Sequence, residues 1–182
     1  MTFEPVARAT PAARTFDACY REHRERLFRL ALRYGAGDAA FAEDVTHDVL
    51  LKLLEHLPRL GEHEDLGGWL YRVTVNTALS RLRHERSVFG RVLKRLKAEP
   101  EPAAPAPDVL FEQHEAAAAA MHTLRAMPPR ERIVICMKIL DGKSQQEIAA
   151  ALSLSEGYVS KLVTRAWDRI RASGWEVDDA EA

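Results

Sequence analysis

Apolar residues recur every three or four positions along most of this 182-residue chain, and this spacing predicts α-helices. The main periodic runs cover residues 16–34, 41–57, 66–82 and 109–125, and shorter runs follow as far as residue 166. The run at 41–57 holds more apolar side chains than one buried stripe needs. We therefore expect that helix to cover two surfaces, its own core and a partner. Alanine is the dominant apolar residue, which also favours an all-α fold.

Capping and helix-breaking residues set the expected helix ends. Thr15 and Asp38 are typical N-cap residues for the first two helices. Gly35 and Gly37 are expected to end the first helix, and Pro58 to end the second. The third helix is expected to begin near residue 66, after a loop.

A proline-rich segment divides the chain. Residues 99–107 contain four prolines, which exclude a helix and indicate an extended, semi-stiff tether. The sequence therefore predicts two small helical domains, an N-terminal helical bundle and a C-terminal helix-turn-helix domain, joined by a Pro/Ala-rich linker. The expected parts are a flexible tail at 1–14, a first domain at 15–97, the linker at 98–108, a second domain at 109–173 and an acidic tail at 174–182.

The most specific local signal lies in the second domain. Ser144 and Glu147 have the spacing of a capping box at the start of a short helix. A break at Ser153 follows, and Ser155 can cap a second helix. Glycine is usual at position 153 of this motif, because the residue there adopts a left-handed backbone. Serine in that conformation costs about 1 kcal/mol. Two short helices in this register predict a DNA-binding helix-turn-helix, and an ordinary helical hairpin is the alternative.

The charge is unevenly distributed. The net charge of −1 at first argues against nucleic-acid binding. However, residues 38–65 hold eight acids and two bases, whereas residues 81–97 hold seven bases and one acid. The last predicted helix presents a further mostly basic face, made of Tyr158, Lys161, Thr164, Arg165 and Arg169. Solvated faces are the usual interpretation of such charge runs, but two opposite runs beside a helix-turn-helix favour binding surfaces.

Other classes of function lack support in the sequence. We find no glycine-rich phosphate loop, no His-Glu-x-x-His and no nucleophile constellation, so we expect neither an enzyme nor a cofactor. His47 and His56 lack a third ligand at suitable spacing for a metal. Two unpaired cysteines indicate a reduced, cytoplasmic setting, and no apolar run is long enough for membrane insertion.

Three motifs in order resemble those of bacterial RNA polymerase sigma factors of the extracytoplasmic-function (ECF) group. They lie at residues 42–53, at residues 69–78 and, in the second domain, within residues 128–159. The resemblance covers about 15–86 and 110–172. It implies a factor that binds the RNA polymerase core enzyme, recognises and melts promoter DNA, and directs promoter-specific transcription initiation.

The resemblance also implies roles for individual residues. Those implied to bind core polymerase are Asp44, Asp48, Leu51 and Lys52. Those implied to bind the minus-ten element are the loop residues Leu60, Gly61, Glu62 and His63, and the helical residues Trp69, Arg72, Asn76 and Arg81. Those implied to bind the minus-thirty-five element are Ser155, Tyr158, Lys161, Thr164, Arg165 and Arg169.

Departures from the family pattern limit these implications. Tyr158 stands where members commonly have threonine, so the base preference of relatives should not be copied. Trp69 is expected to be a buried aromatic anchor rather than a wedge, and Thr46 a solvent-exposed helical threonine. An anti-sigma factor is a further candidate partner. The alternative function is a helix-turn-helix regulator that binds duplex operators without polymerase, but it leaves the apolar, acidic helix at 42–57 unexplained.

Overall fold

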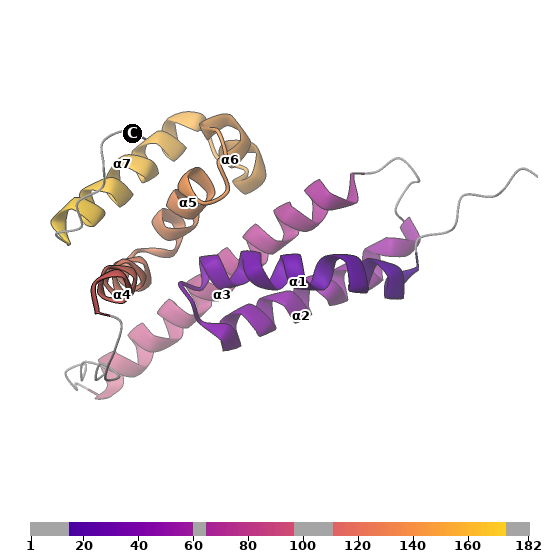
Figure 1. The fold of residues 1–182 in the computed structure, drawn as a ribbon, viewed down its shortest axis with the longest axis horizontal. Helices are drawn as coiled ribbons and strands as arrows, with labels where there is room; N and C mark the ends of the chain where they lie inside the picture. Colours follow the sequence, from indigo (N-terminus) through magenta and orange to yellow (C-terminus); the bar gives the residue numbers. More distant parts are fainter. Residues whose placement is uncertain (1–14, 60–64, 97–110, 174–182) are drawn as a thin grey trace, which may run out of the picture.

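The computed structural model describes residues 15–59, 65–96 and 111–173, with the backbone alone at 89–96 and 111–117. Within these residues there are seven α-helices, one 3-10 helix and no strand, so the all-α prediction is confirmed. In chain order they are α1 (Phe16–Tyr34), α2 (Ala39–His56), η1 (Leu57–Arg59), α3 (Leu66–Leu96), α4 (Phe111–Ala126), α5 (Pro129–Ile139), α6 (Gln145–Leu152) and α7 (Glu156–Ala172) (Figure 1).

Helices α1, α2 and α3, which we call the N-terminal bundle, pack around one apolar core. Val45, Val49 and Leu53 of α2 are completely buried, as are Val75 and Ala78 of α3. Burying each of the larger side chains contributes roughly 1.5–3 kcal/mol. The basic stretch predicted after the third helix belongs to α3 itself, which continues without a break to Leu96.

The caps predicted for this bundle are confirmed. The Thr15 hydroxyl accepts from the amide of Ala18 at 3.3 Å, and Asp38 Oδ1 accepts from the amide of Phe41 at 3.0 Å. Gly35 ends α1 for a reason of space: a Cβ there would lie 2.6 Å from the ring of Phe41. The left-handed backbone falls on Ala36 (φ 53°) and Gly37 (φ 81°) instead.

The expectation for Thr46 is wrong. Its side chain is buried, with 5% of the residue exposed, and its hydroxyl donates to the carbonyl of Ala42 at 2.7 Å. Threonine tolerates this position on the inner face of α2 because its hydroxyl finds a partner within the same helix.

Helices α4 to α7, which we call the C-terminal bundle, contain the helix-turn-helix. Ser144 and Glu147 form both hydrogen bonds of a capping box, and the Ser155 hydroxyl accepts from the amide of Tyr158 at 3.3 Å. Ser153 adopts the left-handed conformation (φ 53°, ψ 49°) that the motif requires. The predicted helix-turn-helix geometry is confirmed.

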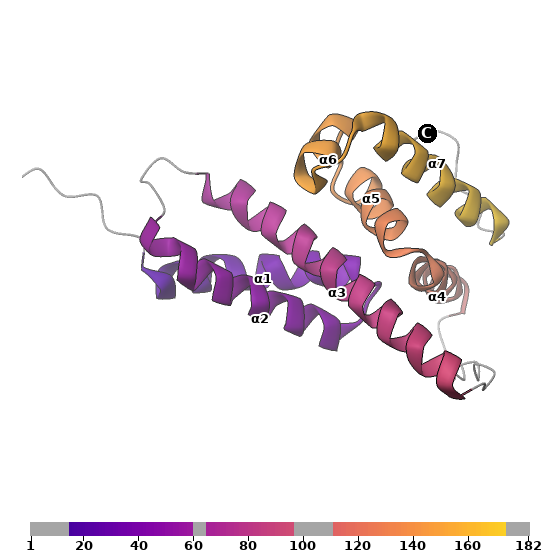
Figure 2. The same cartoon turned by 180° about the vertical axis from the view of Figure 1, so that it is seen from behind.

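The two bundles pack against each other, with α5 and α6 lying along α3 (Figure 2). The end of α1 also contacts α5. Four predicted segments lie outside the described residues: the tails at 1–14 and 174–182, the linker at 98–108 and the loop residues 60–64.

Candidate polymerase and promoter interfaces

The outer face of α2 presents two leucines to solvent. Leu51 is 47% exposed and Leu54 is 50% exposed, whereas the inner leucines Leu50 and Leu53 are buried. Positions 51 and 54 are three residues apart, so they lie on the same face of the helix. The helix therefore has the two apolar surfaces that its sequence predicts. Leu54 was missing from the predicted contacts, although its spacing from Leu51 could have shown it.

Acidic residues of α2 pair with a base of α3. Arg81 contacts Asp44 through Nη1 at 2.7 Å and Asp48 through Nε at 2.8 Å. These hydrogen bonds lower the pKa of Asp48, and the same carboxylates raise the pKa of Arg81. The structure thus joins residues that the sequence assigned to two different partners. Arg81 therefore joins α2 to α3 through two of its three guanidinium nitrogens.

Lys52, the remaining predicted polymerase contact, is also engaged within the N-terminal bundle. Its ammonium donates to the hydroxyl of Thr77 at 2.8 Å. Thr77 is buried in α3, so this bond ties the exposed end of Lys52 to the neighbouring helix. A bound partner would meet Lys52 as an anchored positive charge beside exposed Leu51.

The predicted minus-ten residues on α3 differ in their surroundings. Trp69 is half-buried and stacks on His56, with ring centroids 4.4 Å apart and planes 4° apart. Arg72 and Asn76 are exposed and lie one turn apart on the same face. The Asn76 amide donates to the carbonyl of Ala151 in α6 at 3.0 Å, so the C-terminal bundle already uses it. The predicted loop contacts Leu60 to His63 lie outside the described residues.

The predicted recognition helix α7 exposes an open polar face. Lys161, Thr164 and Arg165 are exposed at helical spacing, while Val159, Leu162 and Val163 are buried beneath them. The exposed Ser155 uses its hydroxyl to cap the same helix. This division leaves the outer face of α7 free for a ligand while the inner face holds the bundle together.

Two further contacts fix predicted recognition residues. Arg130 of α5 donates to the Tyr158 hydroxyl at 3.3 Å, and its guanidinium lies 5.8 Å from the centre of the Tyr158 ring. Arg169 bonds through Nε to the buried carboxylate of Glu131 at 2.7 Å. Arg169 therefore joins α7 to α5, which sequence reasoning did not foresee for a predicted phosphate contact.

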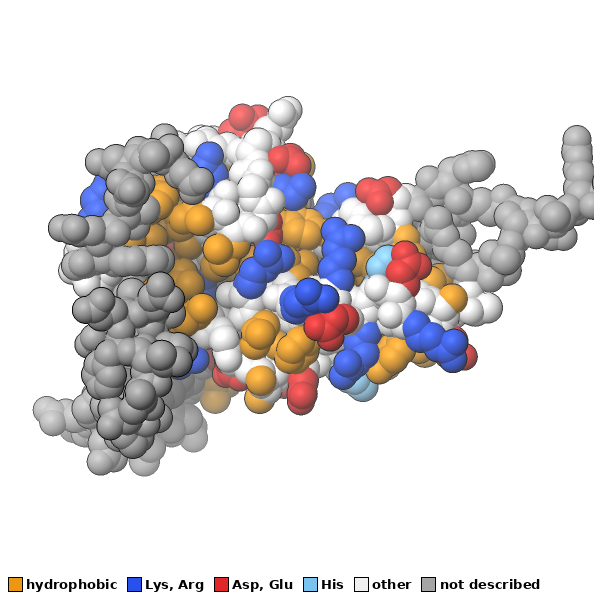
Figure 3. Space-filling view, viewed as in Figure 1, with side chains coloured by type: hydrophobic (Ala, Val, Ile, Leu, Met, Phe, Trp, Pro, Cys, Tyr) orange, Lys and Arg blue, Asp and Glu red, His pale blue; other side chains and the backbone are white. Residues whose placement is uncertain are grey.

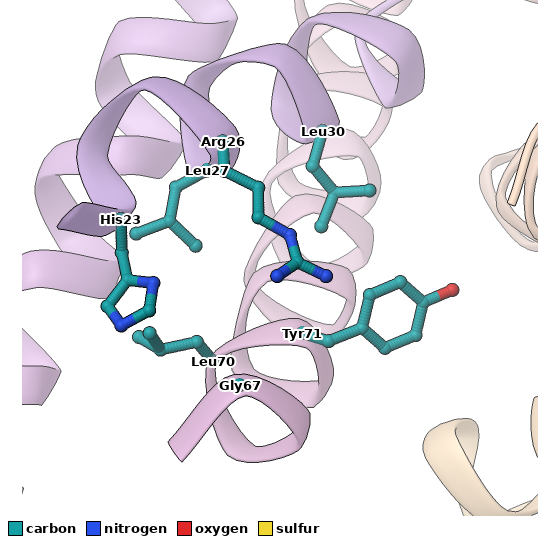
Figure 4. Close-up of a pocket in the computed structure, with 7 residues that line it drawn as sticks. All are labelled: His23, Arg26, Leu27, Leu30, Gly67, Leu70 and Tyr71. Carbon is teal, nitrogen blue, oxygen red and sulfur yellow. The ribbon is translucent and has the colours of Figure 1, made fainter.

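Basic side chains also gather over α1 on the face shown in Figure 3. Beneath them, a hollow of about 420 Å³ lies between α1, the start of α3 and the turn between α5 and α6. A second, smaller pocket lies between α1 and α3, where the Arg26 side chain extends toward Tyr71 (Figure 4). Among the described residues, no group of histidine, cysteine and acidic side chains could hold a metal ion.

Comparisons with known proteins identify the family. The Sigma-70 region 2 family matches residues 19–88, and the Sigma-70 region 4 family matches residues 123–172. The ECF RNA polymerase sigma factor SigL of Mycobacterium tuberculosis is 31% identical over 152 residues, which cover 83% of this chain and 84% of SigL. The chain belongs to the ECF RNA polymerase sigma factors.

Two other similarities agree with this assignment. The ECF sigma factor SigE of Mycolicibacterium smegmatis is 28% identical over 163 residues, and the match covers 86% of this chain but 60% of SigE. In three dimensions the chain is similar to the sigma factor RpoE of Bartonella quintana, solved in complex with the anti-sigma factor NepR. The TM-score is 0.57 at 20% identity, covering 87% of this chain and 95% of that one. This likeness shows a shared helical fold.

The structure also shows polar residues that sequence reasoning missed. Asp141, in the turn between α5 and α6, lies between the two bundles and contacts Arg33, Tyr34 and Tyr71. No local pattern signals this cluster, because its members are up to 108 positions apart in the sequence. Among the helices that the structure describes, none is long and apolar enough to cross a membrane.

Proposed function

We propose that this sigma factor binds the RNA polymerase core enzyme and directs it to specific promoters, which it recognises and helps to melt. It acts as a non-catalytic subunit in the cytoplasm, with no cofactor. The observation that carries this proposal is the presence of region 2 and region 4 in one chain, in that order. A duplex operator-binding regulator would need the second of these alone.

The outer face of α2 is our proposed polymerase-binding surface. It combines exposed Leu51 and Leu54 with the carboxylates of Asp44 and Asp48 and the ammonium of Lys52. Apolar side chains at the centre of such a surface provide most of the affinity, and surrounding charges steer a basic partner. Because Arg81 already neutralises part of the acidic charge, we assign the larger share of affinity to the leucines.

The exposed face of α3, together with the preceding loop, is our proposed minus-ten surface. Arg72 and Asn76 offer a cation and an amide one turn apart, which suits a phosphate and a base edge. Stacking on His56 supports a positioning role for Trp69. We keep Leu60, Gly61, Glu62 and His63 as the proposed pocket for an unstacked base.

The exposed face of α7 is our proposed minus-thirty-five surface. Tyr158, Lys161 and Arg165 are its proposed base contacts, with Thr164, Ser155 and Arg169 beside the phosphates. With a net charge of −1, the free chain makes few favourable phosphate contacts and should bind duplex DNA weakly. Tight promoter binding should then require the polymerase.

We further propose that residues 15–97 and 109–173 act as separate domains tethered by 98–108. The two family matches fall within these ranges. An anti-sigma factor is a candidate partner by similarity to RpoE, which was solved with NepR.

Co-elution with core polymerase tests the proposal. The chain should elute with core enzyme in a one-to-one complex, and the complex should shift a promoter fragment that neither component shifts alone at the same salt concentration. Tight binding of a duplex by the chain alone, with no binding to core enzyme, would instead establish the operator-binding regulator.

A further inference from the structure

The turn between α5 and α6 inserts a buried carboxylate between the two bundles. The Asp141 side chain is 5% exposed. Its Oδ2 accepts from the Tyr34 hydroxyl at 2.5 Å and from the Tyr71 hydroxyl at 3.0 Å, while its Oδ1 lies 3.0 Å from a guanidinium nitrogen of Arg33. Every partner belongs to α1 or α3. We call these four residues the latch cluster.

A second set of contacts surrounds the C-terminal end of α1. The carbonyls of Tyr34 and Ala36 accept from Arg132 at 3.4 Å and from Arg125 at 3.1 Å. The Cys136 thiol lies 4.0 Å from the carbonyl of Arg33. Carbonyls at a helix C-terminus lack partners within their own helix and carry partial negative charge. Arginines of the C-terminal bundle donate hydrogen bonds to carbonyls at this end here, so the interface brings positive side chains to the negative end of α1.

These contacts make the interface selective, because the closed packing supplies partners for groups that it takes out of water. Tyr34 is completely buried, and burial raises the pKa of its hydroxyl beyond the usual range. Closing the bundles takes the Asp141 carboxylate out of water, and that cost is offset only where protein partners replace the water. Closing the bundles gives Asp141 two phenol donors and a cation at once.

The closed arrangement places the two proposed DNA surfaces too close together for a promoter. By their names, the minus-ten and minus-thirty-five elements lie about 25 base pairs apart, or about 85 Å along B-form DNA. In the closed chain, Asn76 of the minus-ten surface is hydrogen-bonded to α6 at 3.0 Å, and α6 directly precedes the recognition helix. Burial and the charge of Arg130 in α5 also lower the pKa of Arg83 in α3.

We infer that Asp141 is an autoinhibitory latch: it holds the free chain closed, and the chain engages both promoter elements only after the latch cluster separates. This inference rests on the proposed function for its consequence, but the latch itself can be tested without DNA. The 14 residues from 97 to 110 can span up to about 50 Å when extended, which allows the bundles to separate while remaining tethered.

The accessibility of the two cysteine thiols shows whether the latch cluster is closed. Cys136 is buried at the interface beside Arg33, whereas Cys19 is buried in α1 within the N-terminal bundle. Separation of the bundles uncovers Cys136 alone, and global unfolding uncovers both. The measurement is the rate at which a maleimide modifies each thiol in the full chain, resolved by mass spectrometry of peptides.

The decisive variant is Asp141→Ala, with Asp168→Ala as the matched control. Asp168 is also an aspartate of the C-terminal bundle, but it is exposed and pairs within α7 with Arg171. We expect Asp141→Ala to speed the modification of Cys136 roughly tenfold or more, since it removes charge-assisted hydrogen bonds, and to leave Cys19 unchanged. Asp168→Ala should change neither rate.

A Cys136 rate in Asp141→Ala equal to that of the wild type would overturn the latch. If both thiols react faster, the variant has lost its fold, and Tyr71→Phe decides instead. That change removes one donor to Asp141 and keeps the ring. A faster rate at Cys136 alone supports the latch, and an unchanged rate contradicts it.

Transcription separates the failure of the latch from the failure of the proposed function. Wild-type chain that supports run-off transcription with core polymerase establishes the function whatever the thiols show. If the function holds and the latch is real, Asp141→Ala should reach half-maximal transcription at a lower chain concentration, because a larger fraction of the free chain is already open. An unchanged half-maximal concentration would contradict the autoinhibitory role.

Discussion

Removing the two exposed leucines of α2 is the sharpest perturbation of the proposed polymerase-binding surface. Leu51 and Leu54 are about half exposed in the free chain, so roughly half of the burial energy of each remains available to a partner. Fully burying a leucine contributes roughly 1.5–3 kcal/mol, which leaves about 1 kcal/mol for each residue on binding. Leu51→Ala with Leu54→Ala should therefore weaken core binding by about 2 kcal/mol, or roughly 30-fold.

The assay is titration of core polymerase with fluorescently labelled chain, together with thermal unfolding of the chain alone. Stability should change by less than about 0.5 kcal/mol, because both side chains lie on the surface. Ile139→Ala is the matched control: Ile139 is similarly exposed, at 42%, but lies in α5. A double variant that binds core polymerase within threefold of the wild type would refute the assignment of this face.

Three further outcomes are expected. Lys161→Ala should weaken binding to promoters with the preferred minus-thirty-five base by roughly 1–3 kcal/mol, measured by competition among promoters. An equal loss of binding on all promoters would indicate a phosphate contact instead. Arg130→Ala should reduce discrimination at the position read by Tyr158, as measured with the same set of promoters, and it should have no effect when combined with Tyr158→Ala. Burial raises the pKa of Cys136 to about 12, above its unfolded value. Stability to urea should therefore fall as the pH rises from about 9 toward 12, and the stability of the Cys136→Ala variant should fall less steeply over the same range.

The helices and their ends could be predicted from the sequence because local interactions determine them. Thr15, Asp38, Ser144 and Ser155 each bond an amide within three residues, and a pattern of neighbours is enough to foresee such a bond. The left-handed Ser153 followed from the same motif.

What the sequence did not predict depends on contacts between distant helices. Thr46 is polar, yet the packing of α2 buries it, and a hydrogen bond to its own helix makes that burial tolerable. Arg81, which the resemblance assigns to DNA, also pairs with carboxylates 33 and 37 positions earlier, a contact that the charge pattern did not predict. The sequence neighbours of Asp141 do not indicate its contacts, because these require α1, α3 and the turn to meet in space.

This arrangement also changes how the net charge should be understood. Several opposite charges that the sequence assigned to separate partners are paired within the chain, as Asp44 and Asp48 are with Arg81. The free chain is therefore a weaker electrostatic target for both polymerase and DNA than its charge runs suggest. The exposed apolar residues of α2 and the exposed bases of α7 remain its open surfaces.

The most direct test of the central claim is run-off transcription by purified core polymerase on a promoter library, with the 5′ ends of the transcripts mapped. With the chain added, transcripts should begin at a small set of sites that share one upstream element, and Lys161→Ala should weaken the use of that element. Transcripts at the same positions and levels with and without the chain would contradict the claim that it directs promoter-specific initiation.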